Sequence, residues 1–158
     1  MRIGDKFPDI LGKDAEGKDV RLSDYPGKKF IIYFYPKDNT PGCSAEACSL
    51  NEGEDVLSGM GYQVIGVSKD TAASHQKFAA KYGLGFPLVA DTDLTLSNLA
   101  GVWQKKKMAG REYYGIVRTT FVTDEEGVVT DIIEKVNTKQ AADQLIALLE
   151  GRNDPNPS

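Results

Sequence analysis

Cysteine and histidine are scarce in this chain, which limits the disulfide frameworks and metal sites that it can build. Two cysteines and one histidine occur among 158 residues. A secreted scaffold held together by disulfides would carry more cysteines in a shorter chain. A closed zinc site commonly needs four Cys or His ligands at tighter spacing than that of Cys43 and Cys48. In a reducing compartment, a close cysteine pair is more often redox-active or metal-binding than structural. Because the ligand set is so small, we expect no metal.

The sequence also lacks a long apolar segment and a strong charge of either sign. The longest apolar and aromatic run, residues 30–35, is far too short to cross a bilayer. A net charge of -4 argues against general attraction to nucleic acid or to an anionic membrane. The first residues contain no apolar stretch of the kind that a secretory signal has. We therefore expect a cytoplasmic protein with no nucleic-acid or membrane partner; a periplasmic or organellar location would require a leader that has been removed.

No repeat, linker or low-complexity segment interrupts the chain, and its length suits one domain. We expect this domain to cover residues 1–150. The last residues, 151–158, contain asparagine, aspartate and two prolines, and we expect them to form a frayed tail.

Apolar segments alternate with helix-forming segments along the chain. The residue patterns predict strands at 18–22, 29–35, 62–68, 86–90, 113–123 and 128–136, and helices at 43–57, 71–82, 94–100 and 138–150. Residues 29–35 are apolar at both parities, which is typical of a central strand buried on two faces. The order predicts an α/β fold with a central mixed sheet flanked by helices. A closing hairpin followed by a helix suits a thioredoxin-like arrangement.

Cys43 lies where the loop after the predicted central strand becomes a helix. The start of a helix presents unpaired N–H groups and partial positive charge, which favour a thiolate over a thiol. A free cysteine has a pKa of about 8.5, and this placement beside a cation lowers it by one to several units. Taken alone, Cys43 would be assigned to core packing, because free cysteines are so often buried. Its position together with the second cysteine favours a nucleophile instead.

The neighbours of Cys43 suit a reactive thiolate. Pro36 and Pro41 fix the backbone φ and stiffen the loop, and Pro36 can also shield the sulfur from water. Thr40 has a hydroxyl that can donate to and accept from an incoming peroxide, although it could simply cap the helix. Gly42 allows a close approach of the backbone to a ligand.

The pattern Pro36-x-x-x-Thr40-x-x-Cys43 resembles the active-site motif of the peroxiredoxins. The longer segment 34–48 closely resembles the bacterioferritin-comigratory-protein, or peroxiredoxin Q, subfamily. Three further segments extend this resemblance over the chain: residues 4–8, 66–70 and 115–121. The resemblance implies a thioredoxin-like fold and reduction of hydroperoxides without a metal, flavin or haem cofactor.

By this resemblance Cys43 is the peroxidatic cysteine, whose thiolate attacks a peroxide and becomes a sulfenic acid. Pro36 then shields the thiolate and Thr40 hydrogen-bonds the peroxide. Arg118 matches the active-site arginine of the family and would stabilise the thiolate and polarise the O–O bond. Glu46 follows Cys43 by one helical turn; it either pairs with Arg118 or is a solvated helix carboxylate.

Cys48 matches the resolving position of the subfamily, which implies an intramolecular disulfide with Cys43 and re-reduction by thioredoxin. Five residues along an ideal helix separate two Cα atoms by about 8.7 Å, whereas a disulfide spans about 6.8 Å at most. We therefore expect the segment from Gly42 to about Leu50 to unwind in each turnover. Alternatively, Cys48 is a buried helix cysteine and an external thiol resolves Cys43. With no C-terminal cysteine to resolve across a dimer, we expect a monomer.

Two other functions remain possible on sequence grounds. One is a disulfide oxidoreductase acting on proteins, although that class typically uses Cys-x-x-Cys. The other is a thioredoxin-like binding module or redox sensor in which oxidation of Cys43 changes a partner contact. For the peroxidase, hydrogen peroxide, alkyl and lipid hydroperoxides are all candidate substrates, and glutaredoxin or glutathione are alternative reductants. We expect His75 to be solvated on a polar helix, and residues 105–107 to form a solvated loop.

Overall fold

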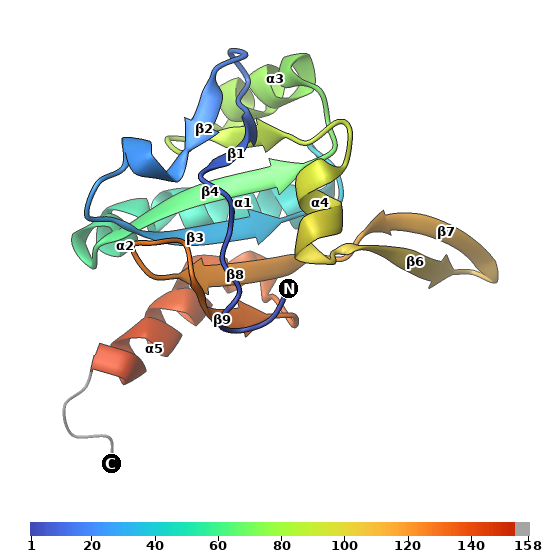
Figure 1. Ribbon diagram of the computed structural model, residues 1–158. Helices are drawn as coiled ribbons and strands as arrows, with labels where there is room; N and C mark the ends of the chain where they lie inside the picture. The colour runs from blue at the N-terminus through green and yellow to red at the C-terminus, as the bar shows by residue number, and fades with distance from the viewer. Residues whose placement is uncertain (154–158) are drawn as a thin grey trace.

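A computed structural model of the protein describes residues 1–153 (Figure 1). Its centre is a five-stranded sheet in the order β5 (Leu88–Ala90), β4 (Tyr62–Ser68), β3 (Lys29–Phe34), β8 (Thr119–Thr123) and β9 (Val129–Ile133). Strand β3 pairs in parallel with β4, and β4 with β5. Strand β8 runs antiparallel to both β3 and β9. The sheet is therefore mixed, as the sequence predicts.

Strand β3 is central because both of its faces are apolar. Residues 30–35 are at most 1% exposed. The odd-numbered side chains of this strand pack with apolar residues of α1 (Pro41–Glu52), α2 (Glu54–Gly59) and α5 (Ala141–Asn153). The even-numbered ones pack with the N-terminal segment and α4 (Thr95–Ala100). Burying each such side chain stabilises the fold by about 1.5–3 kcal/mol, so the strand that leads into the Cys43 loop is firmly fixed.

The helix predicted at 43–57 is two helices in the structure. Helix α1 begins at Pro41 and ends at Glu52, and α2 follows after Gly53. A Cβ atom at Gly53 would lie 2.5 Å from the Cβ of Ala142, so only glycine permits this approach of α5. The break therefore follows from helix packing, which the sequence pattern of one helix does not reveal.

The two-stranded sheets are the elements that the sequence predicted least well. Strand β1 (Ile10–Lys13), which was not predicted, pairs with β2 (Asp19–Arg21). Strand β6 (Trp103–Met108) pairs with β7 (Arg111–Ile116) in a hairpin that projects from the body of the molecule (Figure 1). Residues 105–107 lie in β6, so the prediction of a loop there was wrong, although Lys105 and Lys107 are exposed as predicted. A projecting hairpin buries neither face fully and shows no alternating apolar pattern.

The strand predicted at 113–123 is divided between β7 and β8, with Val117 and Arg118 between them. The backbone N–H of Val117 donates to the carbonyl of Val102, 2.8 Å away, and belongs to neither strand ladder. Arg118 thus stands at the junction of the hairpin and the central sheet rather than inside a strand.

The remaining elements are α3 (Ala72–Tyr82) and the short 3₁₀ turns η1 (Leu22–Asp24) and η2 (Thr138–Gln140). Helix α5 continues to Asn153, three residues into the tail predicted at 151–158. Residues 154–158 of that tail lie outside the described residues. Within residues 1–153, no helix combines the length and apolarity that a membrane crossing requires.

Close packing of β4 against its neighbours gives a test of the core. A Cβ atom at Gly66 would lie 2.8 Å from Cδ2 of Leu88 and 2.9 Å from Cζ of Tyr33. We expect Gly66→Ala to lower the free energy of unfolding by about 1–3 kcal/mol in urea denaturation, because overpacking forces side chains from their rotamers. Gly59→Ala is the control, since a Cβ there meets nothing within 4 Å. Equal stability of the two variants would contradict this packing.

Candidate active site

Cys43 is the third residue of α1 and lies almost completely buried behind the loop that follows β3. Thr40 is the N-cap with an extended backbone, φ -100° and ψ 154°, and Pro41 is the first helical residue. Proline suits that position because its fixed φ matches the helix. The first helical hydrogen bond runs from the N–H of Ser44 to the carbonyl of Thr40, 2.8 Å. Cys43 therefore sits within the turn whose N–H groups have no intrahelical partner.

Arg118 joins the two acidic groups of the site. Its Nη2 donates to Sγ of Cys43 at 3.3 Å, and its Nη1 donates to Oε1 of Glu46 at 2.5 Å. The Glu46 side chain is fully buried, and the Arg118 side chain is 22% exposed. Glu46 is thus not the solvated carboxylate of the alternative interpretation. A Cβ at Gly42 would lie 3.2 Å from Nη2 of Arg118. Because glycine has no Cβ, the guanidinium has room at this position.

Burial and charge act in opposite directions on these groups. Burial raises the pKa of Glu46 to about 7, although the nearby Arg118 lowers it. Burial lowers the pKa of Arg118, but the negative charges of Glu46 and Cys43 outweigh this and raise it above its ordinary value. The guanidinium therefore stays charged beside the sulfur, and at neutral pH the carboxyl is near its titration midpoint.

Thr40 makes a hydrogen bond with the loop rather than with the helix. Its Oγ1 donates to the carbonyl of Lys37 at 3.0 Å, and its side chain makes no cap hydrogen bond. The hydroxyl proton is therefore engaged, and the oxygen lone pairs remain to accept. Pro36 is half-buried in the same loop, directly after the buried Tyr35.

Cys48 lies on the same continuous helix as Cys43, and both thiols are free. Cys48 is half-buried. Burial raises the pKa of its thiol, and the charge of Glu52 raises it further. Helix geometry holds the two Cα atoms about 8.7 Å apart, beyond the reach of a disulfide, as the sequence predicts for an intact helix.

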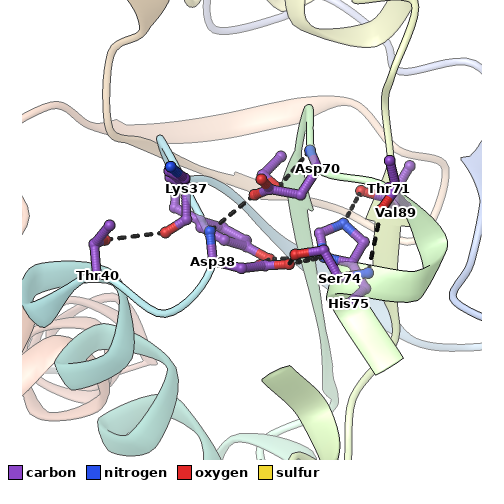
Figure 2. A network of polar contacts seen from close by, with 10 residues as sticks. Lys37, Asp38, Thr40, Asp70, Thr71, Ser74, His75 and Val89 are labelled. Atoms are coloured by element: carbon purple, nitrogen blue, oxygen red, sulfur yellow. Dashed lines mark hydrogen bonds and ion pairs between the residues drawn. The ribbon is translucent and has the colours of Figure 1, made fainter. Parts of the chain in front are cut away.

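His75 is completely buried, which corrects the expectation of a solvated side chain. It lies on α3 beneath the loop that follows β3 (Figure 2). Its Nδ1 is 2.7 Å from Oδ2 of Asp38, and its Nε2 is 3.0 Å from the carbonyl of Val89. Both partners are acceptors, so both bonds require the imidazolium form. No local pattern predicts this contact, because His75 and Asp38 are 37 residues apart and α3 is otherwise polar.

Asp38 collects three hydrogen-bond donors around its carboxylate. Tyr35 donates its hydroxyl to Oδ1 at 2.6 Å, and Ser74 donates to Oδ2 at 2.8 Å, beside His75. Burial raises the pKa of Asp38, but hydrogen bonds from His75 and Tyr35 prevail and lower it below its ordinary value. An ionised Asp38 therefore ties the loop to α3. Sequence analysis assigned no role to Asp38, although its place in the motif loop and the presence of one histidine were the available signals.

Comparisons with known proteins show the family to which the chain belongs. Residues 3–132 match the AhpC/TSA family. The chain is 39% identical to peroxiredoxin Bcp of Bacillus subtilis over 98% of both chains. It is 45% identical to a putative peroxiredoxin bcp of Coxiella burnetii, over 86% of this chain and 90% of that protein. The chain belongs to the AhpC/TSA family of peroxiredoxins.

The solved structures that resemble this peroxiredoxin include proteins of the peroxiredoxin Q and bacterioferritin-comigratory-protein subfamily. A mutant of Xylella fastidiosa PrxQ superposes with a TM-score of 0.87 at 32% identity, over 98% of each chain. The Xanthomonas campestris bacterioferritin comigratory protein superposes with a TM-score of 0.81 at 36% identity, over 90% of each chain. The fold is therefore thioredoxin-like, and the peroxiredoxin Q resemblance seen in the sequence is confirmed. In residues 1–153, no three Cys, His, Asp or Glu side chains gather as a metal site requires.

The protonation of His75 is directly observable because the chain has one histidine. With ¹⁵N-labelled histidine, we expect NMR to show a proton on each ring nitrogen, since each nitrogen faces an acceptor. In Asp38→Asn the ring loses its anionic partner, and we expect a neutral ring that keeps the Nε2–H bond to Val89. A neutral tautomer in the unsubstituted protein would rule out the ion pair.

The buried Glu46 should make stability depend on pH. Its pKa is about 7 in the folded protein, above the ordinary value of 4.5. The folded state therefore holds the proton more tightly than the unfolded state. The bound proton therefore contributes at most about 3 kcal/mol to the free energy of unfolding. This contribution is fully present below about pH 4.5 and is lost as the pH rises through about 7. We expect the free energy of unfolding of Glu46→Gln, measured in urea titrations, to change less between pH 5 and 8 than that of the unsubstituted protein. An equal dependence on pH in the two proteins would contradict the raised pKa of Glu46.

Proposed function

We propose that this peroxidase reduces hydrogen peroxide and organic hydroperoxides through Cys43, and that Cys48 resolves the product within the same chain. The observation that carries the proposal is the contact of Arg118 with the sulfur of Cys43, 3.3 Å, at the first turn of α1. A guanidinium and a helix start both favour the thiolate, which is the nucleophilic form. Alkyl peroxide reduction is the activity named for the similar Xanthomonas campestris protein.

In the first step the thiolate of Cys43 attacks the terminal oxygen of the hydroperoxide. The S–O bond forms as the O–O bond breaks, and the sulfur is oxidised to a sulfenic acid. The leaving oxygen takes up a proton from solvent and departs as water or an alcohol. Arg118 stabilises the negative charge that moves from sulfur to the leaving oxygen.

The other site residues prepare this step. Thr40 accepts a hydrogen bond from the hydroperoxide, because its own proton is already donated to Lys37. Glu46 holds Arg118 from the side away from the sulfur and so fixes the orientation of its planar guanidinium. Pro36 covers the sulfur and limits the access of water.

In the second step the thiol of Cys48 attacks the sulfenic sulfur, the S–S bond forms, and water leaves. The two residues must first approach one another, so the start of α1 has to unwind. The end of the helix is tied down: Ser49 accepts from the N–H of Ala142 at 3.1 Å, and Asn51 bonds to Gly83 and Gly85. We therefore place the unwinding at residues 42–48, N-terminal to these anchors.

Thioredoxin is the proposed reductant: its dithiol reduces the disulfide, returns both cysteines to thiols and is itself oxidised to a disulfide. The chain contains no third cysteine that could take the resolving role. A monomer is sufficient for this cycle, because both reacting sulfurs come from one helix. The proposed location is the cytoplasm.

Free thiols counted before and after one equivalent of hydrogen peroxide test the proposal. We expect two thiols to disappear together in the unsubstituted protein, and peroxide consumption to be abolished in Cys43→Ser. In Cys48→Ser one thiol should disappear, with a sulfenic acid trapped by dimedone, while thioredoxin-supported turnover stalls. Full thioredoxin-supported turnover in Cys48→Ser would remove Cys48 from the resolving role. Undiminished peroxide consumption in Cys43→Ser would overturn the whole proposal.

A further inference from the structure

The loop that carries Thr40 is hydrogen-bonded to the carboxylate of Asp70, which the proposed chemistry does not use. Asp70 lies two residues after β4 and before α3. Its Oδ2 accepts from the backbone N–H of Asp38 at 2.8 Å, as Figure 2 shows. Hydrogen bonds to an ionised acceptor are about twice as strong as those between neutral groups. The hydrogen bond from Asp70 therefore restrains the peptide unit between Lys37 and Asp38.

The same peptide unit receives the hydrogen bond of Thr40. Its N–H belongs to Asp38 and its carbonyl to Lys37, and that carbonyl accepts from Oγ1 of Thr40 at 3.0 Å. A peptide unit is planar, and in the trans form its N–H and C=O point in opposite directions. Figure 2 shows Asp70 and Thr40 on opposite sides of this unit. Fixing the N–H therefore also fixes the direction of the carbonyl.

Further hydrogen bonds hold the side chains of Asp70 and Asp38 in position next to this restrained peptide unit. Ser68, the last residue of β4, donates its hydroxyl to Oδ2 of Asp70 at 2.7 Å and so orients the carboxylate. The Asp38 side chain is held independently by His75. Between Asp38 and Thr40, Asn39 has a left-handed backbone with φ 58°, a conformation of raised energy for a residue with a side chain. The loop therefore needs such anchors to keep its shape.

We propose that Asp70 is a positioning residue for the peroxide step, acting through the Lys37–Asp38 peptide on the hydroxyl of Thr40. This inference rests on the proposed function. With the carbonyl of Lys37 fixed, the Thr40 proton stays directed at it, and the lone pairs of Oγ1 face the position of the hydroperoxide. Without Asp70 the carbonyl can turn away, and the hydroxyl then rotates into orientations that no longer accept from the substrate.

The test compares the reaction of Cys43 with hydrogen peroxide and with iodoacetamide, because alkylation does not use Thr40. We expect Asp70→Ala to slow the peroxide reaction about fivefold to tenfold and to leave alkylation unchanged. Asp70→Asn keeps an acceptor oxygen, so we expect it to retain most of the peroxide rate. Asp93→Ala is the matched control: this exposed aspartate also accepts from a backbone N–H, that of Thr95, and we expect no change in either rate.

A double-mutant cycle separates this role from general support of the fold. If Asp70 acts through Thr40, then Asp70→Ala should add no further loss in a Thr40→Val background. An equal loss in that background, a parallel fall in alkylation, or an unchanged peroxide rate in Asp70→Ala would each overturn the inference. If Asp70→Ala does not fold, a peroxide rate of Asp70→Asn that falls in parallel with alkylation would overturn it as well. An unsubstituted protein that does not react with peroxide would instead reject the proposed function.

Discussion

The thiolate proposed for Cys43 would be stable at its almost completely buried position only next to compensating positive charge, and most of the site follows from this constraint. Arg118 supplies the charge at 3.3 Å from the sulfur, aided by the start of α1. The guanidinium would itself be costly to bury alone, and Glu46 offsets that cost from its other side. Gly42 leaves the space that the guanidinium fills. In the proposed function, each of these residues therefore helps to stabilise the negative charge of the Cys43 sulfur.

In the proposed cycle the site is divided into a part that stays fixed and a part that moves. The loop before α1 is bonded to β4 and α3 through Asp70 and through the Asp38–His75 pair. The end of α1 is bonded to α5 and to the residues after α3. Between these two anchored regions lie residues 42–48, which contain both cysteines. In the proposed cycle, such an arrangement allows the helix start to unwind without disturbing β3 or the loop before α1.

The sequence predicts the parts of this structure that depend on local patterns. The central strand and a helix start close to Cys43 were found because their signals lie within a few neighbouring positions. The pairing of Arg118 with Glu46 was only one of two interpretations, because it joins segments 72 residues apart. His75 was misjudged for the same reason, since burial of a single polar side chain leaves no periodic pattern. Strand β6 was missed because its exposed positions carry charged residues, which are typical of a loop.

Glu46 lies inside the segment that is proposed to unwind, and this links the sulfur chemistry to proton exchange. In the intact helix the carboxyl is buried and, with a pKa of about 7, holds roughly half a proton at neutral pH. Once residues 42–48 leave the helix, water would reach this carboxyl and its affinity for protons would fall to that of an ordinary glutamate. Disulfide formation would then release acid, and acidification would favour the dithiol form. The midpoint potential of the enzyme would consequently shift with pH by more than its two thiols alone require.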